Sequence, residues 1–392
     1  MTSSSRSSAL NLLAASAALA ALLSGCGDSD GSSEYAKAEE ALKSGNLAKA
    51  GELFAQTAEI APTNIDALVM LAKTRLANGE IREAREAAKS ALALDGDAED
   101  ALELAAQTAW HSRDYAEARG IYRRLASDAG RAPEARSRAW ARLGIVDMSE
   151  YDTDKSRVAL RDSARCDFLA ALALDPKNAA ARYHLGLLYR DSYLYLDYAL
   201  DQLSFYKATA PKVDRHLKAV CDTMIPELRG QIANEKAARP GVAKRNVDGC
   251  AKALRRGVEA FSKGTYKTAK LRYGEAMSAD PLSFAAAEGY ARSCAKADTT
   301  AAGKKTAYEA YREACRLGPS KVDTFLETAR LAAEIGRSAA AEDLYSRALA
   351  ANPKSLPALD GLIRTCVKNG EKESAAAYRA YMAFIQKKAA QR

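Results

Sequence analysis

The sequence has few of the residues and motifs that enzymes use for catalysis. Its three histidines, His111, His184 and His216, lie far apart and without the spacing of metal ligands. The motifs H-E-x-x-H and G-x-S-x-G and a phosphate-binding P-loop are all missing from the sequence, and we identify no convergent cluster of carboxylates. We therefore expect a protein that is not an enzyme, and that uses no metal, cofactor or small-molecule substrate.

Aromatic residues and prolines are also scarce. Aromatics make up 7% of the chain and only 10 of its 392 residues are proline, whereas alanine is abundant throughout. Alanine favours helices and aromatic residues favour strands, so this composition predicts an all-α protein. A chain of this length exceeds one compact domain, which leaves several domains or one elongated array as the alternatives.

The N-terminal segment is apolar but too short to be an ordinary membrane-spanning helix. Its uncharged run covers residues 9–23, about 15 residues where a helix needs ~20 to cross a bilayer. The run ends in Leu23-Ser24-Gly25-Cys26, which resembles the lipobox of bacterial lipoproteins. The resemblance implies a signal peptide over residues 1–25 and lipidation of Cys26; an ordinary cleaved signal, in which Cys26 has no role, is the alternative.

Residues 26–33 are polar and rich in glycine and serine, so we expect a flexible tether after the lipidated cysteine. Several acyl chains on Cys26 would anchor the chain stably. By resemblance to lipoprotein sorting, glycine rather than aspartate after Cys26 favours the outer membrane over the inner membrane. The expected location is therefore the bacterial cell envelope, with the chain lipid-anchored and facing the periplasm.

The body of the chain repeats itself. Alanines recur in similar surroundings with successive spacings of 34, 34, 46, 35, 70, 38, 34 and 34 residues, and they lie at Ala50, Ala84, Ala118, Ala164, Ala199, Ala269, Ala307, Ala341 and Ala375. Four of the eight spacings are 34, which is the period of tetratricopeptide repeats. A small residue at this position lets the two helices of a hairpin approach closely.

Two segments resemble the first-helix signature of the tetratricopeptide-repeat (TPR) family. Trp140-Ala141-Arg142-Leu143-Gly144 fits the pattern W-x-x-L-G, and Leu185-Gly186-Leu187-Leu188-Tyr189 fits L-G-x-x-Y. The resemblance implies an all-α, right-handed α-solenoid of about nine TPR-like helical hairpins, irregular near the middle. We expect each hairpin to bury its apolar face mainly against its neighbours in sequence, which would give an extended curved rod.

The longest spacing divides the chain. Residues 34–211 would form an N-terminal TPR array and residues 246–392 a C-terminal TPR array. Residues 212–245 carry no clear motif, and the prediction there is a helical connector or a degenerate repeat, with a helix bent or broken at Pro226. The sequence leaves open whether this segment is a hinge or a cryptic repeat.

Six cysteines remain when Cys26 is assigned to lipid: Cys166, Cys221, Cys250, Cys294, Cys315 and Cys366. Their number allows 15 pairings, so the sequence does not settle their disulfide state. Cys294 and Cys315 share one hairpin but lie ~10 Å apart along its axis, too far for a disulfide. We expect most of the six to be small buried apolar residues.

Binding of a partner is the expected function, and the concave groove lined by the first helices is the surface that the family uses. Helical phasing places twelve residues in this groove: Glu103, Gln107, Trp110, His111, Arg142, Ile145, Met148, Tyr183, Leu187, Arg190, Arg255 and Phe261. Such a mixture suits an extended peptide or a helix. Alternatively, Trp110 and Tyr183 simply pack between hairpins.

Charge does not decide the partner. The chain carries 58 basic and 50 acidic residues, and the two signs mostly alternate along the helices, as on solvated faces. One hypothesis is a membrane-anchored scaffold that binds an unidentified protein and serves the assembly or export of an envelope machine. The other is a protein that binds an envelope polymer, glycan or anionic lipid, through a basic segment at residues 236–256. Nucleic acid is not expected as a partner of an exported protein.

Overall fold

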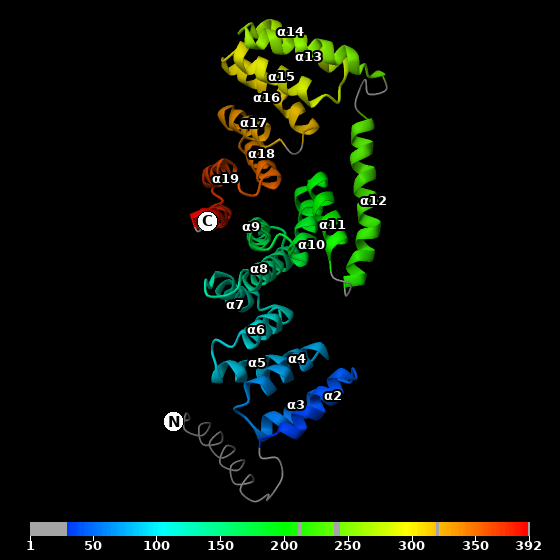
Figure 1. The fold of residues 1–392 in the computed structure, drawn as a ribbon. Coiled ribbons are helices and arrows are strands. Elements are labelled where there is room, and N and C mark those ends of the chain that lie inside the picture. Colours follow the sequence, from blue (N-terminus) through cyan, green and yellow to red (C-terminus); the bar gives the residue numbers. More distant parts are fainter. Residues whose placement is uncertain (1–29, 211–213, 239–243, 319–320, 391–392) are drawn as a thin grey trace, which may run out of the picture. The chain divides into compact units, whose positions relative to one another are not determined.

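The computed structural model describes residues 30–210, 214–238, 244–318 and 321–390 (Figure 1). All regular secondary structure in these ranges is helical, and most helices contact the next helix in the chain to form a hairpin. The expected all-α solenoid of about nine hairpins is therefore confirmed. The predicted signal peptide and Cys26 lie outside the described residues, and none of the described helices is long and apolar enough to cross a membrane.

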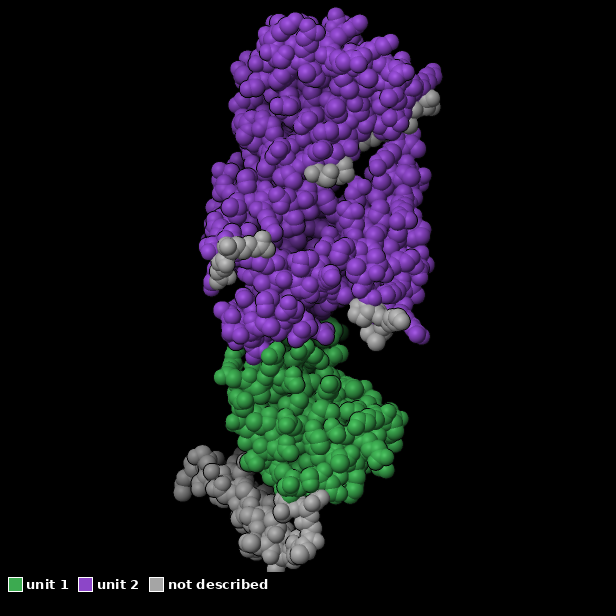
Figure 2. Space-filling model, in the orientation of Figure 1, with its two compact units in different colours: residues 1–124 green, residues 125–392 purple. Residues whose placement is uncertain are grey.

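The chain divides into two compact units, residues 1–124 and residues 125–392, which Figure 2 shows in different colours. The boundary falls within helix α7. The helices of unit 1 are α2 (Ser32–Lys43), α3 (Leu47–Ile60), α4 (Ile65–Ala77), α5 (Ile81–Leu94), α6 (Glu99–His111) and α7 (Tyr115–Ser127). In unit 1, α2 pairs with α3 and α4 with α5, and α4 also contacts α6.

Unit 2 holds six hairpins and helix α12, which belongs to no hairpin but contacts α11. Its first elements are α8 (Pro133–Thr153), α9 (Val158–Leu174), α10 (Ala179–Leu188), a π-helical turn η1 (Tyr189–Tyr193), α11 (Leu196–Thr209) and α12 (Arg215–Ala237). The later helices are α13 (Val247–Ser262), α14 (Tyr266–Ala279), α15 (Phe284–Ala297), α16 (Ala301–Leu317), α17 (Val322–Glu334), α18 (Ser338–Ala351), α19 (Leu356–Asn369) and α20 (Lys372–Ala390).

Short polar residues and glycines set the ends of these helices. The side chain of Asn64 accepts a hydrogen bond from the backbone N–H of Ala67 (3.0 Å), which caps the start of α4. At the turn from α4 to α5, Gly79 adopts φ 82°, a left-handed conformation that residues with a Cβ rarely adopt. Signals of this kind are local, so the sequence alone specifies the hairpin boundaries.

The repeat alanines form the centre of each hairpin. All nine are fully buried, as their 34-residue period predicts. On the first helices, glycines stand where a larger residue would collide with the second helix. A Cβ on Gly144 would lie 2.7 Å from the ring of Phe168, and one on Gly186 would lie 2.7 Å from Leu203. Close helix–helix contact therefore accounts for the L-G signature.

Helix α12 occupies most of the segment predicted to connect the two arrays. It continues through Pro226 as a single helix rather than ending there. Its apolar residues Cys221, Met224, Ile225 and Leu228 are spaced as one helical face, and all four are buried. After Leu228 only Ile232 is even partly buried. The first half of α12 therefore makes most of the contacts of this helix with the rest of unit 2.

Contacts between distant repeats qualify one expectation. Hairpins pack mainly against their sequence neighbours, as expected, but in unit 2 the last helix, α20, also packs against α9. The guanidinium of Arg165 on α9 is fully buried and donates to Ser346 Oγ on α18 and to Tyr378 Oη on α20. Tyr195 also donates to the carboxylate of Asp343 on α18 (2.8 Å). We call these five residues the closure seam.

The six described cysteines are all buried, and none forms a disulfide. Their environment agrees with the expectation of small apolar residues. Most of the tyrosine-rich segment between α10 and α11 is buried as well: Tyr189, Tyr195 and Tyr198 are at most 8% exposed and their rings contact one another. These tyrosines fill the space between helices instead of forming a binding surface.

Candidate functional site

A groove lies on the first helices of unit 1. It has a volume of about 480 Å³, and its walls are two first helices, α4 and α6. The lining residues are Val69, Met70, Lys73, Leu76, Ala77, Asp100, Glu103, Leu104, Gln107 and His111. Several of them are equivalent positions of successive repeats, because Met70 and Leu104, and Lys73 and Gln107, are 34 residues apart. The repeat itself therefore builds the groove.

The groove combines an apolar floor with polar side chains. Met70 and Leu104 provide apolar surface, while Lys73 and Asp100 are exposed and supply one charge of each sign. The amide of Gln107 donates to the carboxylate of Glu103 (3.2 Å). Apolar contact area with a few oriented polar groups suits a peptide or a helix. No arrangement for acid–base or nucleophilic chemistry is present among the groove residues.

Three of the four groove residues predicted on α6 line this groove: Glu103, Gln107 and His111. The fourth, Trp110, is half-buried and does not line it; its ring lies 4.8 Å from the ring of His111. Three of the four residues predicted on α6 therefore share one hollow, and their role in binding stays a prediction.

The predicted residues on α8 lie in unit 2. Arg142 is exposed, whereas Ile145 and Met148 are half-buried and pack against the main hydrophobic core. Burial, and then the positive charge of Arg142, lowers the pKa of His184, which lies on the neighbouring helix α10. Of these three residues, only Arg142 is exposed.

Of the predicted residues on α10 and the following turn η1, two lie against α12 of the same chain. Arg190 donates to the Sδ atom of Met224 on α12 and to Asp191 (2.5 Å). Tyr183 is 8% exposed, and its ring centre lies 5.1 Å from that of Tyr206, close to Cys221 of α12. Leu187 is half-buried against the same core. In this structure α12 thus takes up contacts that were expected to face a partner.

Arg255 and Phe261, the predicted residues on α13, do not share one pocket. Arg255 is exposed, and Phe261 is half-buried with its ring 5.2 Å from Tyr266. The guanidinium of Arg292 lies 5.6 Å from the same ring. The twelve predicted residues are therefore distributed over several surfaces, and only the three on α6 line the unit 1 groove.

Comparison with known proteins identifies the repeats. Models of the tetratricopeptide repeat match residues 41–107 and residues 304–356, one segment in each unit. The chain therefore contains tetratricopeptide repeats in both units. No curated protein sequence matches it significantly.

Several solved structures are similar to about half of this TPR protein. PilF of Pseudomonas aeruginosa is 19% identical, with 54% of this chain and 94% of that chain covered and a TM-score of 0.40. MamA from Desulfovibrio magneticus RS-1 is 17% identical, with 53% and 98% covered and a TM-score of 0.36. A thermophilic TPR protein in Thermus thermophilus is 21% identical, with 50% and 98% covered and a TM-score of 0.36.

Sequence reasoning missed half of the unit 1 groove. It named no residue of α4, although Met70 and Lys73 line the groove opposite α6. The 34-residue register contained the necessary signal, because subtracting 34 from Leu104 and Gln107 gives these two positions. The α4 residues that line the groove include no aromatic residue and no arginine, and no family signature marks this helix.

A second, more charged groove lies on the later repeats of the TPR protein. Arg330, Tyr345 and Arg364 line two adjoining hollows of about 340 and 290 Å³ over α17, α18 and α19. Both arginines are already paired: Arg330 binds Glu327 (2.6 Å), and Arg364 binds Asp360 (3.0 Å). An incoming ligand would have to break these ion pairs, which makes this groove the weaker candidate.

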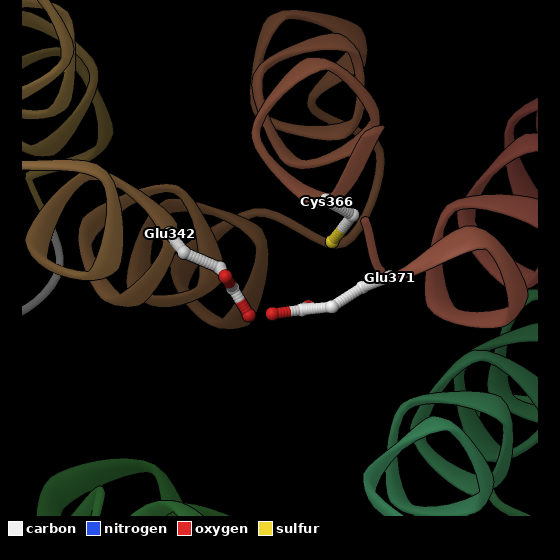
Figure 3. Close-up of side chains that lie close together, drawn as sticks. All are labelled: Glu342, Cys366 and Glu371. Carbon is white, nitrogen blue, oxygen red and sulfur yellow. The ribbon is translucent and has the colours of Figure 1, made fainter. Parts of the chain in front are cut away.

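Among the described residues, one trio of side chains lies close enough to share a metal ion. The trio consists of Glu342 on α18, Cys366 on α19 and Glu371 just before α20. Their ligand atoms lie within 4.8 Å of one another, and Figure 3 shows the three side chains directed toward a common point. Burial, and then the charge of Glu371, raises the pKa of Glu342. Burial also raises the pKa of the Cys366 thiol, so the thiol is protonated at neutral pH.

Proposed function

We propose that this TPR protein is a membrane-anchored scaffold of the bacterial cell envelope that holds a protein partner in the unit 1 groove and is not an enzyme. The observation that supports the proposal most is the groove on α4 and α6, with Glu103, Gln107 and His111 on one wall. Tetratricopeptide repeats match the segment that contains most of it. Assembly or export of an envelope machine is the role that we propose for the complex.

The groove chemistry favours a protein segment over a small molecule. Its apolar floor would contact hydrophobic side chains, and the exposed Lys73 and Asp100 would pair with charges at the rim of the partner. Groove recognition of this kind depends on a few anchors spaced along a peptide or helix.

Pulldown of the partner tests this proposal. The test variant is the full chain with Glu103→Lys and Gln107→Lys, which places two long cationic side chains in the groove. We expect these side chains to block the partner, so that its recovery from crosslinked membranes falls about tenfold or more. The matched control is Glu86→Lys with Ser90→Lys, which has the same spacing on the exposed side of α5. Unmodified chain should recover one dominant protein; a broad mixture, or equal recovery by both variants, contradicts the proposal.

Fractionation of cells tests the anchor. Replacing Cys26 with alanine removes the thiol to which lipid would attach, so we expect the chain to leave the membrane fraction; Ser29→Ala is the control and should stay there. Mass spectrometry of the unmodified protein should find an acylated Cys26 as its first residue. A mature chain that starts elsewhere would show that the anchor is absent, without affecting the groove proposal.

A further inference from the structure

Helix α13 carries an apolar stripe on its exposed side. Val247 is 59% exposed and Val258 is 58% exposed, and both rank among the most exposed large apolar residues that the structure describes. Ala251 is also exposed and Leu254 is half-buried. At 100° per residue these four side chains fall within an arc of about 60°, so they form one continuous stripe along the helix.

The stripe lies on the first helix of the later repeats. Helix α13 packs against α14 and α15 through its other side, where Cys250, Ala253 and Ala260 are buried (Figure 1). In a solenoid, the outer face of a terminal repeat normally carries polar residues, because no further repeat covers it. Exposed valines at this position therefore indicate a surface that another molecule covers.

Two opposite charges flank the stripe. Asp248 and Arg255 are exposed, and neither forms a hydrogen bond or an ion pair with another described residue. Being seven residues apart, they lie about 20° from each other around the helix and so share one edge of the stripe. Glu259, which lies about 20° beyond Asp248, is already paired with Lys263, so Asp248 and Arg255 are the oppositely charged residues of this edge that remain to be paired, two helical turns apart.

We infer that the protein self-associates through this stripe, with the α13 helices of two copies packed antiparallel about a two-fold axis. With the axis midway between Ala251 and Lys252, Asp248 of each copy lies level with Arg255 of the other. Two equivalent ion pairs then form, as an isologous interface requires.

The apolar residues fit the same arrangement. In this register Val247 of one copy lies level with the midpoint between Leu254 and Val258 of the other. The Val247 side chain of each copy therefore enters a gap between two apolar side chains of its partner. The small Ala251 lies next to the axis and allows the two backbones to approach. One register therefore satisfies both the charges and the packing.

The mixed charge of the edge selects a second copy over a membrane surface. Anionic lipid headgroups would attract Arg255 but repel Asp248. A second copy satisfies both residues. A single helix pair buries less area than the ~1,200 Å² at the lower limit of stable interfaces, so we expect a dimer with a dissociation constant on the order of 10 μM.

Charge exchange provides the decisive test. In sedimentation experiments on the full chain in a mild non-ionic detergent, Asp248→Arg or Arg255→Asp alone should weaken self-association about tenfold, because each places like charges together. The double variant with both changes should regain the affinity of the original chain. Only a direct Asp248–Arg255 contact between copies predicts this recovery.

Two further variants, each with a matched control, keep the result interpretable. Val258→Asp should abolish the dimer, while Val367→Asp, at a valine that is 51% exposed on α19, should leave it unchanged. Ala251→Cys should give an intermolecular disulfide under oxidation, and Ala36→Cys on α2 should not. A chain that stays monomeric up to about 100 μM, a double variant without recovery, or α13-dependent binding to anionic vesicles in place of dimerisation would overturn the inference.

Discussion

Replacing Arg165 with alanine is expected to lower the free energy of unfolding of unit 2 by about 3–5 kcal/mol. The guanidinium is completely buried and donates to Ser346 and Tyr378, and it also lies 4.4 Å from the ring centre of Tyr193. Alanine leaves both hydroxyls without their donor, opens a cavity and removes a cation near the buried Asp162. Each of these effects destabilises the folded state.

Urea unfolding measured by circular dichroism checks this prediction, with the transition of unit 2 fitted separately because the chain has two units. Hydrogen exchange should show weaker protection of α20, which loses its contact with α9. Arg364→Ala is the control: this side chain is 69% exposed and pairs with Asp360, so its loss should change stability by less than about 1 kcal/mol. A loss below about 1 kcal/mol for Arg165→Ala would show that the closure seam contributes little.

Acid is expected to destabilise unit 2 through His184. Burial, followed by the positive charge of Arg142, lowers the pKa of His184 from 6.5 to about 4. The ring stacks on Phe168 at 6.0 Å, and its Nδ1 atom is buried without a hydrogen-bond partner. The folded protein therefore holds this imidazole neutral, whereas the unfolded chain protonates it more readily.

The direction in which stability changes with pH follows from proton binding. Between pH 6.5 and pH 4 the unfolded state binds more protons at His184, so the stabilisation present above pH 6.5 is lost as the pH falls. Because His184 keeps some solvent exposure, we expect the free energy of unfolding to be roughly 2–3 kcal/mol lower at about pH 4 than above pH 6.5. His184→Leu should remove this part of the pH dependence, while replacement of the exposed His216 by glutamine should keep it. Identical pH profiles for the original chain and His184→Leu would contradict the account.

Local signals predicted the hairpins well. The 34-residue period and the buried position of Ala50 or Ala341 depend on contacts within a single hairpin and its neighbours, which short-range sequence patterns specify. The caps at Asn64 and Gly79 likewise act within a few residues. These features can be read from the sequence because the residues that interact lie close together in it.

The groove was predicted only in part. Phasing around α6 placed Glu103 and Gln107 on the face that lines the groove, because the buried apolar residues of α6 fix its opposite face. The same reasoning failed to show that Tyr183 and Arg190 contact α12. Helix α12 lacks the repeat motif. No pattern in the sequence therefore indicated which face of the neighbouring hairpins it would pack against.

The sequence by itself determined that this protein consists of paired helices, because alanine, glycine and capping residues act over one or two turns. Only the tertiary structure decided that the last helix of unit 2 returns to α9. Arg165 meets Ser346 and Tyr378 across 181 and 213 residues, and a contact over such a separation leaves no periodic trace in the chain. Whether an arginine is buried or solvated depends on partners that are brought to it by the folding of all the intervening repeats.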